Sequence, residues 1–497
     1  MIFLGLDVGT SSCKCSAFDA NGELIAEASR EYAKTPGQTG LDAENVFADV
    51  CAAVGGCAKQ IKDKCGNHQI SSVTVSSFGE SFVAINKSGG IMSDIIIYSD
   101  SGGDKEVEIL KQKVPDIAKI AGANPKAFYA LPKMMHVLKT RPEIAKNLWK
   151  FLQVSDYIIH RLCGEAVIDY SVACRSLALD VLKQNWSPEI LAAAGLDANK
   201  LSSPVPAGTV AGVIHKHLAG ELNLPEDTKI VVGVHDQIAS AAGAGALREG
   251  EAVVGTGSVE CITPVFGSPR LDPGFLDCNF ACIPHVAPGR YATYAFTMSG
   301  GSLLTWYRDR IVPHLKITAK EKNCSVYKLL DESCPKEPSD LIIVPHFGGT
   351  GTPELDPLAS GTMAGFSMTM GLPEIYRAIL EGLCFELRYN RDRLALFDVT
   401  FSTLRATGGG TRSDIWLQLK ADILGIPVSP LRNADAGTAG GAMLAAVATG
   451  EFSSFEEAAK VFVKVREPFL PDGRKKEYYD EKYGKYKRLR QAMTGGF

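Results

Sequence analysis

A turn of small residues near the N-terminus, Asp7 to Ser12, has the composition of a phosphate-binding turn. Glycine, threonine and serine at a hairpin can present consecutive backbone N–H groups and hydroxyls to one anion. Asp7 ends an apolar strand, where a buried carboxylate is costly unless it meets a cation or hydrogen-bond donors. A Mg²⁺ ion that bridges nucleotide phosphates would meet that need. A purely structural hairpin is the alternative.

A second turn, 255–258, reads Gly-Thr-Gly-Ser and lies between two apolar runs, 251–254 and 259–265. Two such turns in one chain favour a clasp around a polyphosphate over two unrelated structural turns. A third cluster, Gly408 to Ser413, follows a predicted strand at 403–407 and opens a helix. Its glycines would let a ring or a ribose lie against the backbone, and a simple strand–helix turn is the alternative. The sequence contains no P-loop and no Rossmann fingerprint at these turns.

Asp236 is the candidate general base. It follows the apolar strand 229–234 and lies at the start of a helix of small residues at 235–246. Because α/β sheets bind ligands beyond the carboxyl ends of their strands, this carboxylate would stand at the mouth of a cleft. There it could orient an attacking hydroxyl and take its proton during phosphoryl transfer. A helix N-cap is the structural alternative, and His235 is expected to be a packing or hydrogen-bonding neighbour.

The elements that would carry these residues form two similar units. Strands at 2–7, 14–19 and 23–31 open the chain, and Asn21-Gly22 is a hairpin signal between the last two. The strand–turn–strand pattern recurs at 251–265, which indicates two related domains.

The glycines of 437–442 favour close helix packing, and the last thirty residues read as a solvated amphipathic helix. Further strands are predicted at 70–77, 82–86 and 229–234, and helices at 42–64, 103–165 (with breaks at Pro115, Pro125, Pro132 and Pro142), 299–310, 373–396, 412–424, 436–449 and 455–463.

The composition excludes several classes of protein. Of the 497 residues 45% are apolar, and the net charge is −4, so no basic excess exists for binding nucleic acid. The thirteen cysteines lack zinc spacing, which is typical of reduced thiols in the cytoplasm. The N-terminus has no basic signal-peptide region, and no apolar run approaches the roughly 18 residues of a membrane span. We therefore expect a cytoplasmic protein that binds neither nucleic acid nor membrane.

Several blocks together resemble the FGGY carbohydrate kinases. The resemblance runs in order over essentially the whole chain and implies two ribonuclease-H-like domains, similar in fold to actin, hexokinase and Hsp70, with ATP in the cleft between them. The implied domains are 1–246 and 247–497. The blocks that carry the resemblance are LGLDVGTSSCK at the N-terminus, HDQ at 235–237, GTGS at 255–258, PHFGGTGTPELDPLASG at 345–361, GGGTRSDIWLQLKADILGIPV at 408–428 and AGTAGGAMLAA at 436–446.

The resemblance implies ATP and Mg²⁺ as cofactors and a small sugar as the acceptor. It implies that Asp7 faces the Mg²⁺ and that Asp236 is the catalytic base. The residues implied to bind the nucleotide are Gly9, Thr10, Ser11, Lys14, Gly255, Thr256, Gly257, Gly409, Gly410 and Asp414. The implied sugar-binding residues, of which Glu80 and Gln237 follow a pattern similar to glycerol kinases, are Glu80, Gln237, Tyr98 and Asp100.

The sugar-binding half departs from the pentulose kinases of the family. These usually have Met-His-Gly where this chain has Gly79-Glu80-Ser81, often an Arg where it has Ser101–Gly103, and Gly-Glu-Arg where it has Gly349–Gly351. The nucleotide half matches well, and the overall length and the block 408–428 are most similar to xylulokinase-like members.

We therefore expect ATP-dependent phosphorylation of a terminal hydroxyl of a small ketose, such as a pentulose, or of a related polyol. Glycerol, gluconate or a deoxy-ketose are alternative acceptors. An actin- or Hsp70-like ATP-driven protein that has no small-molecule acceptor is the alternative from another class. A homodimer is left open.

Overall fold

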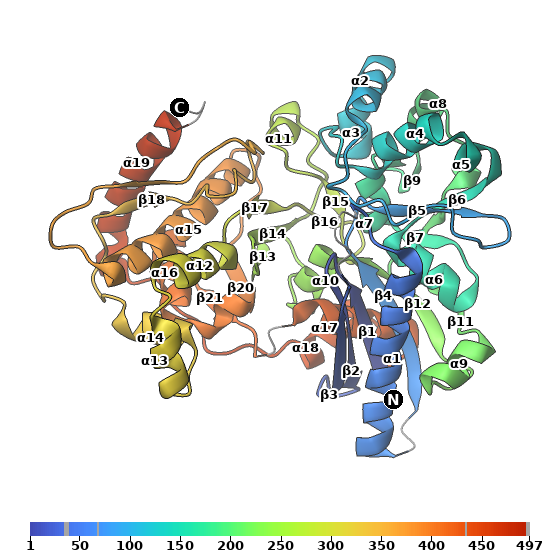
Figure 1. The fold of residues 1–497 in the computed structure, drawn as a ribbon, viewed down its shortest axis with the longest axis horizontal. Coiled ribbons are helices and arrows are strands. Elements are labelled where there is room, and N and C mark those ends of the chain that lie inside the picture. Colours follow the sequence, from blue (N-terminus) through green and yellow to red (C-terminus); the bar gives the residue numbers. More distant parts are fainter. Residues whose placement is uncertain (34–38, 67–68, 433–434, 494–497) are drawn as a thin grey trace.

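The computed structural model describes residues 1–33, 39–66, 69–432 and 435–493. Within these ranges the chain forms two large mixed β-sheets, one on each side of the molecule in Figure 1, with helices packed against them, and four two-stranded sheets. This arrangement confirms the predicted α/β fold class. None of the helices in the described ranges has the length and apolar character that crossing a bilayer demands.

The first sheet begins with the predicted meander of β1 (Ile2–Val8), β2 (Ser12–Asp19) and β3 (Leu24–Glu31). β1 also pairs in parallel with β4 (Ile70–Ser77), which pairs in parallel with β12 (Lys229–His235), and β11 (Val210–Val213) closes the far edge. Side chains of a strand alternate between its two faces. The face of β1 that carries Leu4, Leu6 and Val8 therefore packs against α1 (Ala43–Cys65), and the face that carries Phe3 belongs to a second core.

A largely helical region lies between β4 and β11, and it differs from prediction in two ways. Strand β5 (Phe82–Asn86) forms where predicted but pairs with β6 (Leu148–Gln153), a strand that interrupts the helical stretch predicted at 103–165. Pro132 breaks no helix, because it is the third residue of α4 (Ala130–Thr140), where the missing N–H has no intrahelical acceptor to lose. The other elements of the region are α2 (Asp104–Lys113), α3 (Ile117–Ala121), α5 (Pro142–Asn147), α6 (Val154–Cys163), β7 (Val167–Asp169), α7 (Tyr170–Ala173), β8 (Leu179–Asp180), β9 (Asn185–Trp186), α8 (Pro188–Ala194) and β10 (Ser203–Val205). Helix α9 (Lys216–Leu222) follows β11 and packs on the first sheet.

The second sheet repeats the opening pattern of the first. β13 (Glu251–Thr256) and β14 (Glu260–Phe266) form an antiparallel hairpin, and β13 pairs in parallel with β20 (Thr403–Gly408). Helices α15 (Leu372–Ala395) and α16 (Asp414–Leu424) pack their apolar residues on this sheet. Short segments complete this half: α11 (Pro273–Asp277), β15 (Ile283–Pro284), β16 (Tyr291–Ala292), β17 (Ala295–Thr297), α12 (Gly301–Trp306) followed by a π-helical turn (Tyr307–Ile311), α13 (Leu315–Glu321), α14 (Val326–Ser333), β18 (Ile342–Val344), β19 (Thr362–Ala364) and β21 (Val428–Pro430).

Two helices from the C-terminal part of the chain pack on the first sheet. Figure 1 shows α17 (Ala436–Ala448) and α18 (Phe455–Phe462) beside β1, β2 and α10 (Asp236–Gly243). The predicted close packing of the glycines in α17 is confirmed, because a Cβ on Gly440 would lie 2.1 Å from the carbonyl oxygen of Ala239 in α10. The division at residues 246 and 247 stays a prediction, and α17 and α18 pack on the first sheet although they follow that division in the chain.

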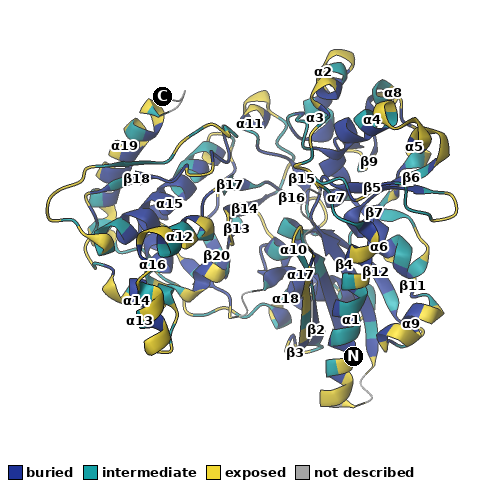
Figure 2. Cartoon of the chain, viewed as in Figure 1, coloured by how far each residue is buried: buried dark blue, intermediate teal, exposed yellow. Residues whose placement is uncertain are grey.

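Burial follows this layering. In Figure 2 the central strands of both sheets, such as β1, β4 and β13, and helices α10 and α17 are mostly buried, whereas exposed residues gather on outer helices such as α9 and α13. The predicted C-terminal helix forms as α19 (Lys476–Ala492), but it is not solvated throughout. Its buried charges pair with carboxylates of α15: Lys482 contacts Glu381, and Arg490 Nε lies 2.7 Å from Glu386 Oε1.

Candidate active site

The two predicted phosphate turns occupy equivalent places, each between the two strands of an antiparallel hairpin, and each is closed by a short backbone hydrogen bond. In the first, between β1 and β2, the N–H of Gly9 donates to the carbonyl of Ser12 at 2.9 Å. In the second, between β13 and β14, the N–H of Gly257 donates to the carbonyl of Val259, also at 2.9 Å. Both turns leave small residues exposed, namely Thr10 and Ser11 in the first and Gly257 and Ser258 in the second. Each turn is therefore open to a ligand, as phosphate binding requires.

Asp7 lies at the end of β1, directly beside the first turn. Its carboxyl is buried, and its Oδ1 has no hydrogen-bond partner among the described residues. Burial raises its pKa well above the ordinary value, and the nearby carboxylates of Asp236 and Asp435 raise it further. A buried, unpartnered carboxyl oxygen beside two further carboxylates fits a divalent cation, which would hold the group in its ionised form. Among the described residues no set of three or more side chains is placed to hold a metal ion by itself, so phosphate oxygens or water would supply the other ligands.

Lys14, on β2, is directly opposite Asp7 in the sheet register. Its Nζ lies 2.7 Å from Glu27 and 2.9 Å from Asp435, so the ammonium group is held by two carboxylates rather than lying free beside the turn. Its predicted contact with phosphate stays a prediction and would require the nucleotide to compete with these ion pairs.

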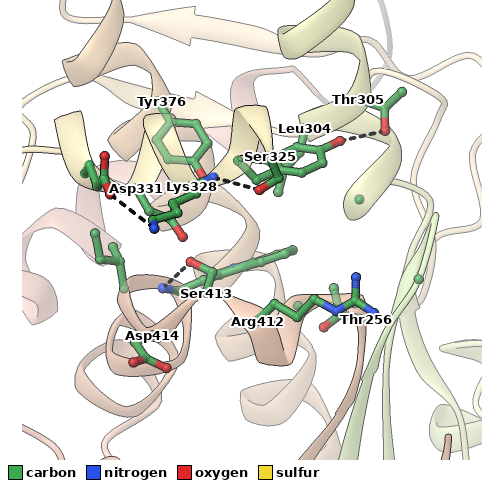
Figure 3. Close-up of a pocket in the computed structure, with 18 of the residues that line it drawn as sticks. Thr256, Leu304, Thr305, Ser325, Lys328, Asp331, Tyr376, Arg412, Ser413 and Asp414 are labelled. Carbon is green, nitrogen blue, oxygen red and sulfur yellow. Dashed lines mark hydrogen bonds and ion pairs between the residues drawn. The ribbon is translucent and has the colours of Figure 1, made fainter. Parts of the chain in front are cut away.

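The second turn opens into a cavity of about 800 Å³ in the second half of the molecule. The predicted adenosine turn forms another part of its wall, so the structure brings Thr256, Gly257, Gly409 and Gly410 together (Figure 3). Apolar and aromatic side chains such as Leu304, Tyr376 and Trp416 line part of the remainder, and polar or charged ones such as Lys328 and Arg412 line the rest. A pocket that combines phosphate-type turns with aromatic and polar walls suits a nucleotide.

Glycine is required where the adenosine turn meets the second phosphate turn. Gly408 has φ +82°, and a Cβ there would lie 2.4 Å from the carbonyl oxygen of Thr256. A Cβ on Gly410 would lie 2.8 Å from the Cβ of Thr256. The hydroxyl of Thr256 donates to Glu260 at 2.6 Å, and Glu260 pairs with buried Lys420 at 2.9 Å, so this hydroxyl helps to hold the turn in place.

Asp414, a member of the predicted nucleotide set, lines the cavity but already forms an ion pair. It lines the cavity as the first residue of α16, where Ser413 is the N-cap. Its carboxylate lies 2.7 Å from Arg466, and Figure 3 shows it on the opposite side of the cavity from Tyr376. Asp414 is thus placed near the ligand space, with its charge already paired.

Asp236 begins α10, directly after β12, as the sequence predicts. Its Oδ1 accepts a hydrogen bond from the N–H of Gln237 at 2.6 Å, which leaves Oδ2 for a ligand. Burial raises the pKa of Asp236 to about 7, and the nearby Glu80 carboxylate contributes to that rise. The side chain is still 28% exposed, so an acceptor hydroxyl can reach it.

The predicted sugar residues divide into two groups. Tyr98 is exposed, and the carboxylates of Glu80 and Asp236 are close enough to raise its pKa, so these three residues share one region. Gln237 follows Asp236 and is half-buried. Asp100 instead stabilises its own loop, since its Oδ2 accepts from the N–H of Ile97 at 3.0 Å, although its Oδ1 is buried without a partner in the described chain.

The structure adds residues that sequence reasoning missed. The guanidinium of Arg175 contacts Glu80, with Nε 2.5 Å from Oε1, and lies over the rings of Tyr129 and Tyr294. Tyr294, from the second half, donates its hydroxyl to Nδ1 of His235 at 2.8 Å. The one available signal was Arg175 itself, a charge within the apolar segment 172–179 that must find a partner when buried.

The surroundings of His235 make its imidazole a neutral and weakly basic group. Burial lowers its pKa well below the ordinary value, and the positive charge of Arg175 lowers it further. Its Nδ1 lies 3.3 Å from the backbone nitrogen of Gln237, 2.8 Å from the hydroxyl of Tyr294 and 3.0 Å from Oδ1 of Asp236. His235 therefore positions the residues around Asp236.

A two-domain fold with glycine turns on both sheets and a carboxylate at a strand end defines an actin- or hexokinase-like phosphotransferase. The N-terminal domain of the FGGY family of carbohydrate kinases matches residues 2–243, and the C-terminal domain of that family matches residues 252–449. The chain belongs to the FGGY family of carbohydrate kinases, and its activity is ATP-dependent phosphorylation of a sugar.

Similar proteins act on different acceptors. The chain is 26% identical to the xylulose kinase of Bacillus subtilis over 490 residues, which cover 98% of this chain and 96% of that protein. It is 27% identical to the gluconokinase of Bacillus licheniformis over 465 residues, covering 91% and 88%. The ligand-bound xylulose kinase of Lactobacillus acidophilus shares the fold, with a TM-score of 0.88 at 22% identity, over 99% of this chain and 98% of that one. Kinases of this family use ATP with a divalent metal ion.

Proposed function

We propose that this kinase transfers the γ-phosphoryl group of ATP to a terminal hydroxyl of a small ketose or polyol, with Asp236 as the general base. The observation that carries the proposal is the place of Asp236. Its carboxylate interacts both with Asp7 beside the first phosphate turn and with Glu80 and Arg175 in the sugar region. A group so placed can take a proton from an acceptor that faces the nucleotide.

Phosphoryl transfer passes through a loose transition state, so catalysis depends mainly on positioning the two reactants and neutralising the charge of the phosphate oxygens. Oδ2 of Asp236 orients the acceptor hydroxyl and takes its proton as the new bond to phosphorus forms. The N–H of Gln237 fixes the other carboxylate oxygen. The turns at Gly9–Ser11 and Gly255–Gly257 would hold the phosphates, and closure of the two halves would exclude water that otherwise hydrolyses ATP.

The divalent metal is proposed to be Mg²⁺, and Asp7 is the residue that would face it. The buried, unpartnered Oδ1 of Asp7 and the adjacent carboxylates fit such an ion. When bound, Mg²⁺ supplies positive charge that neutralises the phosphate oxygens. Lys14, Gly409, Gly410 and Asp414 complete the proposed nucleotide site.

The acceptor is proposed to be a ketose of the kind that xylulokinase-like members use. The similarity to a xylulose kinase over nearly the whole length of both chains supports this choice. A cytoplasmic location and a homodimer stay predictions. The twelve cysteines whose side chains are described are all free thiols, which supports a reducing compartment, and light scattering would measure the assembly.

The decisive variant is Asp236→Asn, assayed with Mg-ATP against a panel of ketoses, polyols and aldonates. Loss of a general base lowers kcat by roughly 10²- to 10⁴-fold. The melting temperature in the presence of an unreactive ATP analogue should still rise, because the variant keeps the nucleotide cavity. Asp227→Asn, at the exposed opposite end of β12, is the matched control and should keep full activity.

Two results would contradict the proposal. Full activity of Asp236→Asn on any acceptor would show that Asp236 is not the general base. A wild-type protein that hydrolyses ATP without a sugar and assembles in an ATP-dependent way would instead indicate an actin-like function.

A further inference from the structure

The sugar region contains a buried arginine that is already paired with a carboxylate. Arg175 is 7% exposed, and its Nε and Nη2 both contact Oε1 of Glu80. Its guanidinium carbon lies 4.9 Å from the ring centre of Tyr129 and 5.5 Å from that of Tyr294. The positive charge is therefore neutralised along one edge by a carboxylate and bounded by aromatic rings.

The backbone is built to bring this pair together. Glu80 has φ +59°, a left-handed conformation that a side-chain-bearing residue adopts at a cost and that clusters at functional sites. A Cβ on the preceding Gly79 would lie 2.9 Å from both Cγ of Arg175 and Cδ2 of His235. Only glycine at 79 lets Arg175 cross the turn and reach Glu80, so the pair is a constructed feature of the site.

The lysines closest to the site are also engaged. Nζ of Lys133 donates to the carbonyl oxygens of Asp100 and Gly102 in the loop that carries Tyr98. Lys14, near Asp7, pairs with Glu27 and Asp435. The charges that surround Asp236 thus come from the carboxylates of Glu80 and Asp7 and from the already paired Arg175.

We infer that the acceptor is a neutral polyhydroxy compound, a ketose or a polyol, and that the Glu80–Arg175 pair excludes aldonates; this rests on the proposed function. Carboxylate oxygens of Glu80 accept hydrogen bonds from sugar hydroxyls, and charge-assisted bonds of this kind are strong. An aldonate would have to take Arg175 from Glu80 or place its own carboxylate beside Glu80 and Asp236. Specificity of this kind arises from the repulsion of the wrong ligand.

The first test compares acceptors that differ only at one terminal carbon: sorbitol with gluconate, and xylitol with xylonate, with xylulose and ribulose added. The kcat/KM of the best neutral acceptor should be at least about tenfold above that of every aldonate. A tenfold ratio corresponds to a difference of about 1.4 kcal/mol in activation free energy. An aldonate that equals or exceeds the best neutral acceptor would overturn the inference while sugar phosphorylation stands. ATP turnover that no acceptor stimulates would overturn the proposed function as well.

The second test is Glu80→Gln, which keeps the shape of the side chain and frees the charge of Arg175. The ratio of aldonate to neutral kcat/KM should rise at least tenfold. A fall of both activities by the same factor would show a merely structural role and would overturn the assignment. Glu226→Gln, an exposed glutamate, is the matched control and should leave the ratio unchanged, and an unreactive ATP analogue should stabilise both variants.

Discussion

At Asp236 the environment, rather than the residue type, sets the chemistry. A carboxyl in water titrates near pH 4 and is a weak base at neutral pH. Burial raises the pKa of Asp236 to about 7, which brings the group into the range where general bases work best. The charged or titratable groups that act on it come from separate elements: Asp7 on β1, Glu80 before β5, Arg175 after α7 and His235 on β12.

This environment predicts the pH dependence of the reaction. Only the ionised form of Asp236 can accept a proton, so kcat/KM should rise with pH through an apparent pKa near 7 and level off above it. Glu80→Gln removes a negative charge that raises the pKa of Asp236, so the pH range over which kcat/KM rises should shift to lower pH. A pH profile of kcat/KM for the best acceptor measures the apparent pKa in the wild type and its shift in the variant. A rise of kcat/KM centred near pH 4 in the wild type would contradict the environment assigned to Asp236.

The crossing of α10 and α17 links the catalytic residue to the C-terminal part of the chain. A Cβ on Gly243 would lie 1.9 Å from the carbonyl oxygen of Ala436, and one on Gly440 would lie 2.1 Å from that of Ala239. Both clashes are with backbone, so no side-chain movement can relieve them. The helix that begins with Asp236 is therefore held against α17 at van der Waals distance.

Gly440→Ala should force α10 and α17 apart and lower the free energy of unfolding by about 1–3 kcal/mol, as overpacking does. Denaturant unfolding followed by tryptophan fluorescence measures the change, and activity should fall with it because α10 carries Asp236. Gly220→Ala in α9 is the matched control. No atom lies within 4 Å of its added Cβ, so this variant should gain about 0.5–1 kcal/mol from helix propensity. Equal effects of the two substitutions would contradict the packing argument.

Across the whole molecule, the two halves meet at the sugar site through Tyr294. This residue follows β16 in the second half, and its hydroxyl reaches His235 at the end of β12 in the first. The nucleotide cavity is lined by a different set of residues, all from the second half. Acceptor binding should therefore depend on the contact between the halves more than nucleotide binding does.

Tyr294→Phe should raise KM for the acceptor about fivefold and leave the Kd of an unreactive ATP analogue unchanged, since a single hydrogen bond contributes roughly 1 kcal/mol. Steady-state kinetics and calorimetry separate the two quantities. Tyr291→Phe is the control, because the ring of Tyr291 stacks on Phe266 and a phenylalanine preserves that contact. A loss of nucleotide affinity in Tyr294→Phe would contradict the separation of the two sites.

Local chemistry was enough to predict where the candidate phosphate turns, Asp7 and Asp236 lie in the fold. Each lies where a strand ends and a small-residue turn or helix begins, and such features are written in consecutive residues. The same holds for α1 and the opening meander, whose apolar spacing predicts them directly. Strand β6 escaped prediction because a short apolar run fits a helix or a strand equally well, and its pairing with β5 decided the outcome.

Sequence by itself therefore determined the family, the reaction and the residues that are proposed to handle phosphate. Tertiary structure alone decided the sugar side: Arg175 meets Glu80, which lies 95 positions earlier in the chain, and Tyr294 reaches His235, which lies 59 positions earlier. Contacts of this kind leave no local periodicity in the chain. They arise because burying a charge or a ring forces it to find a partner, and only the packed fold determines which partner lies within reach.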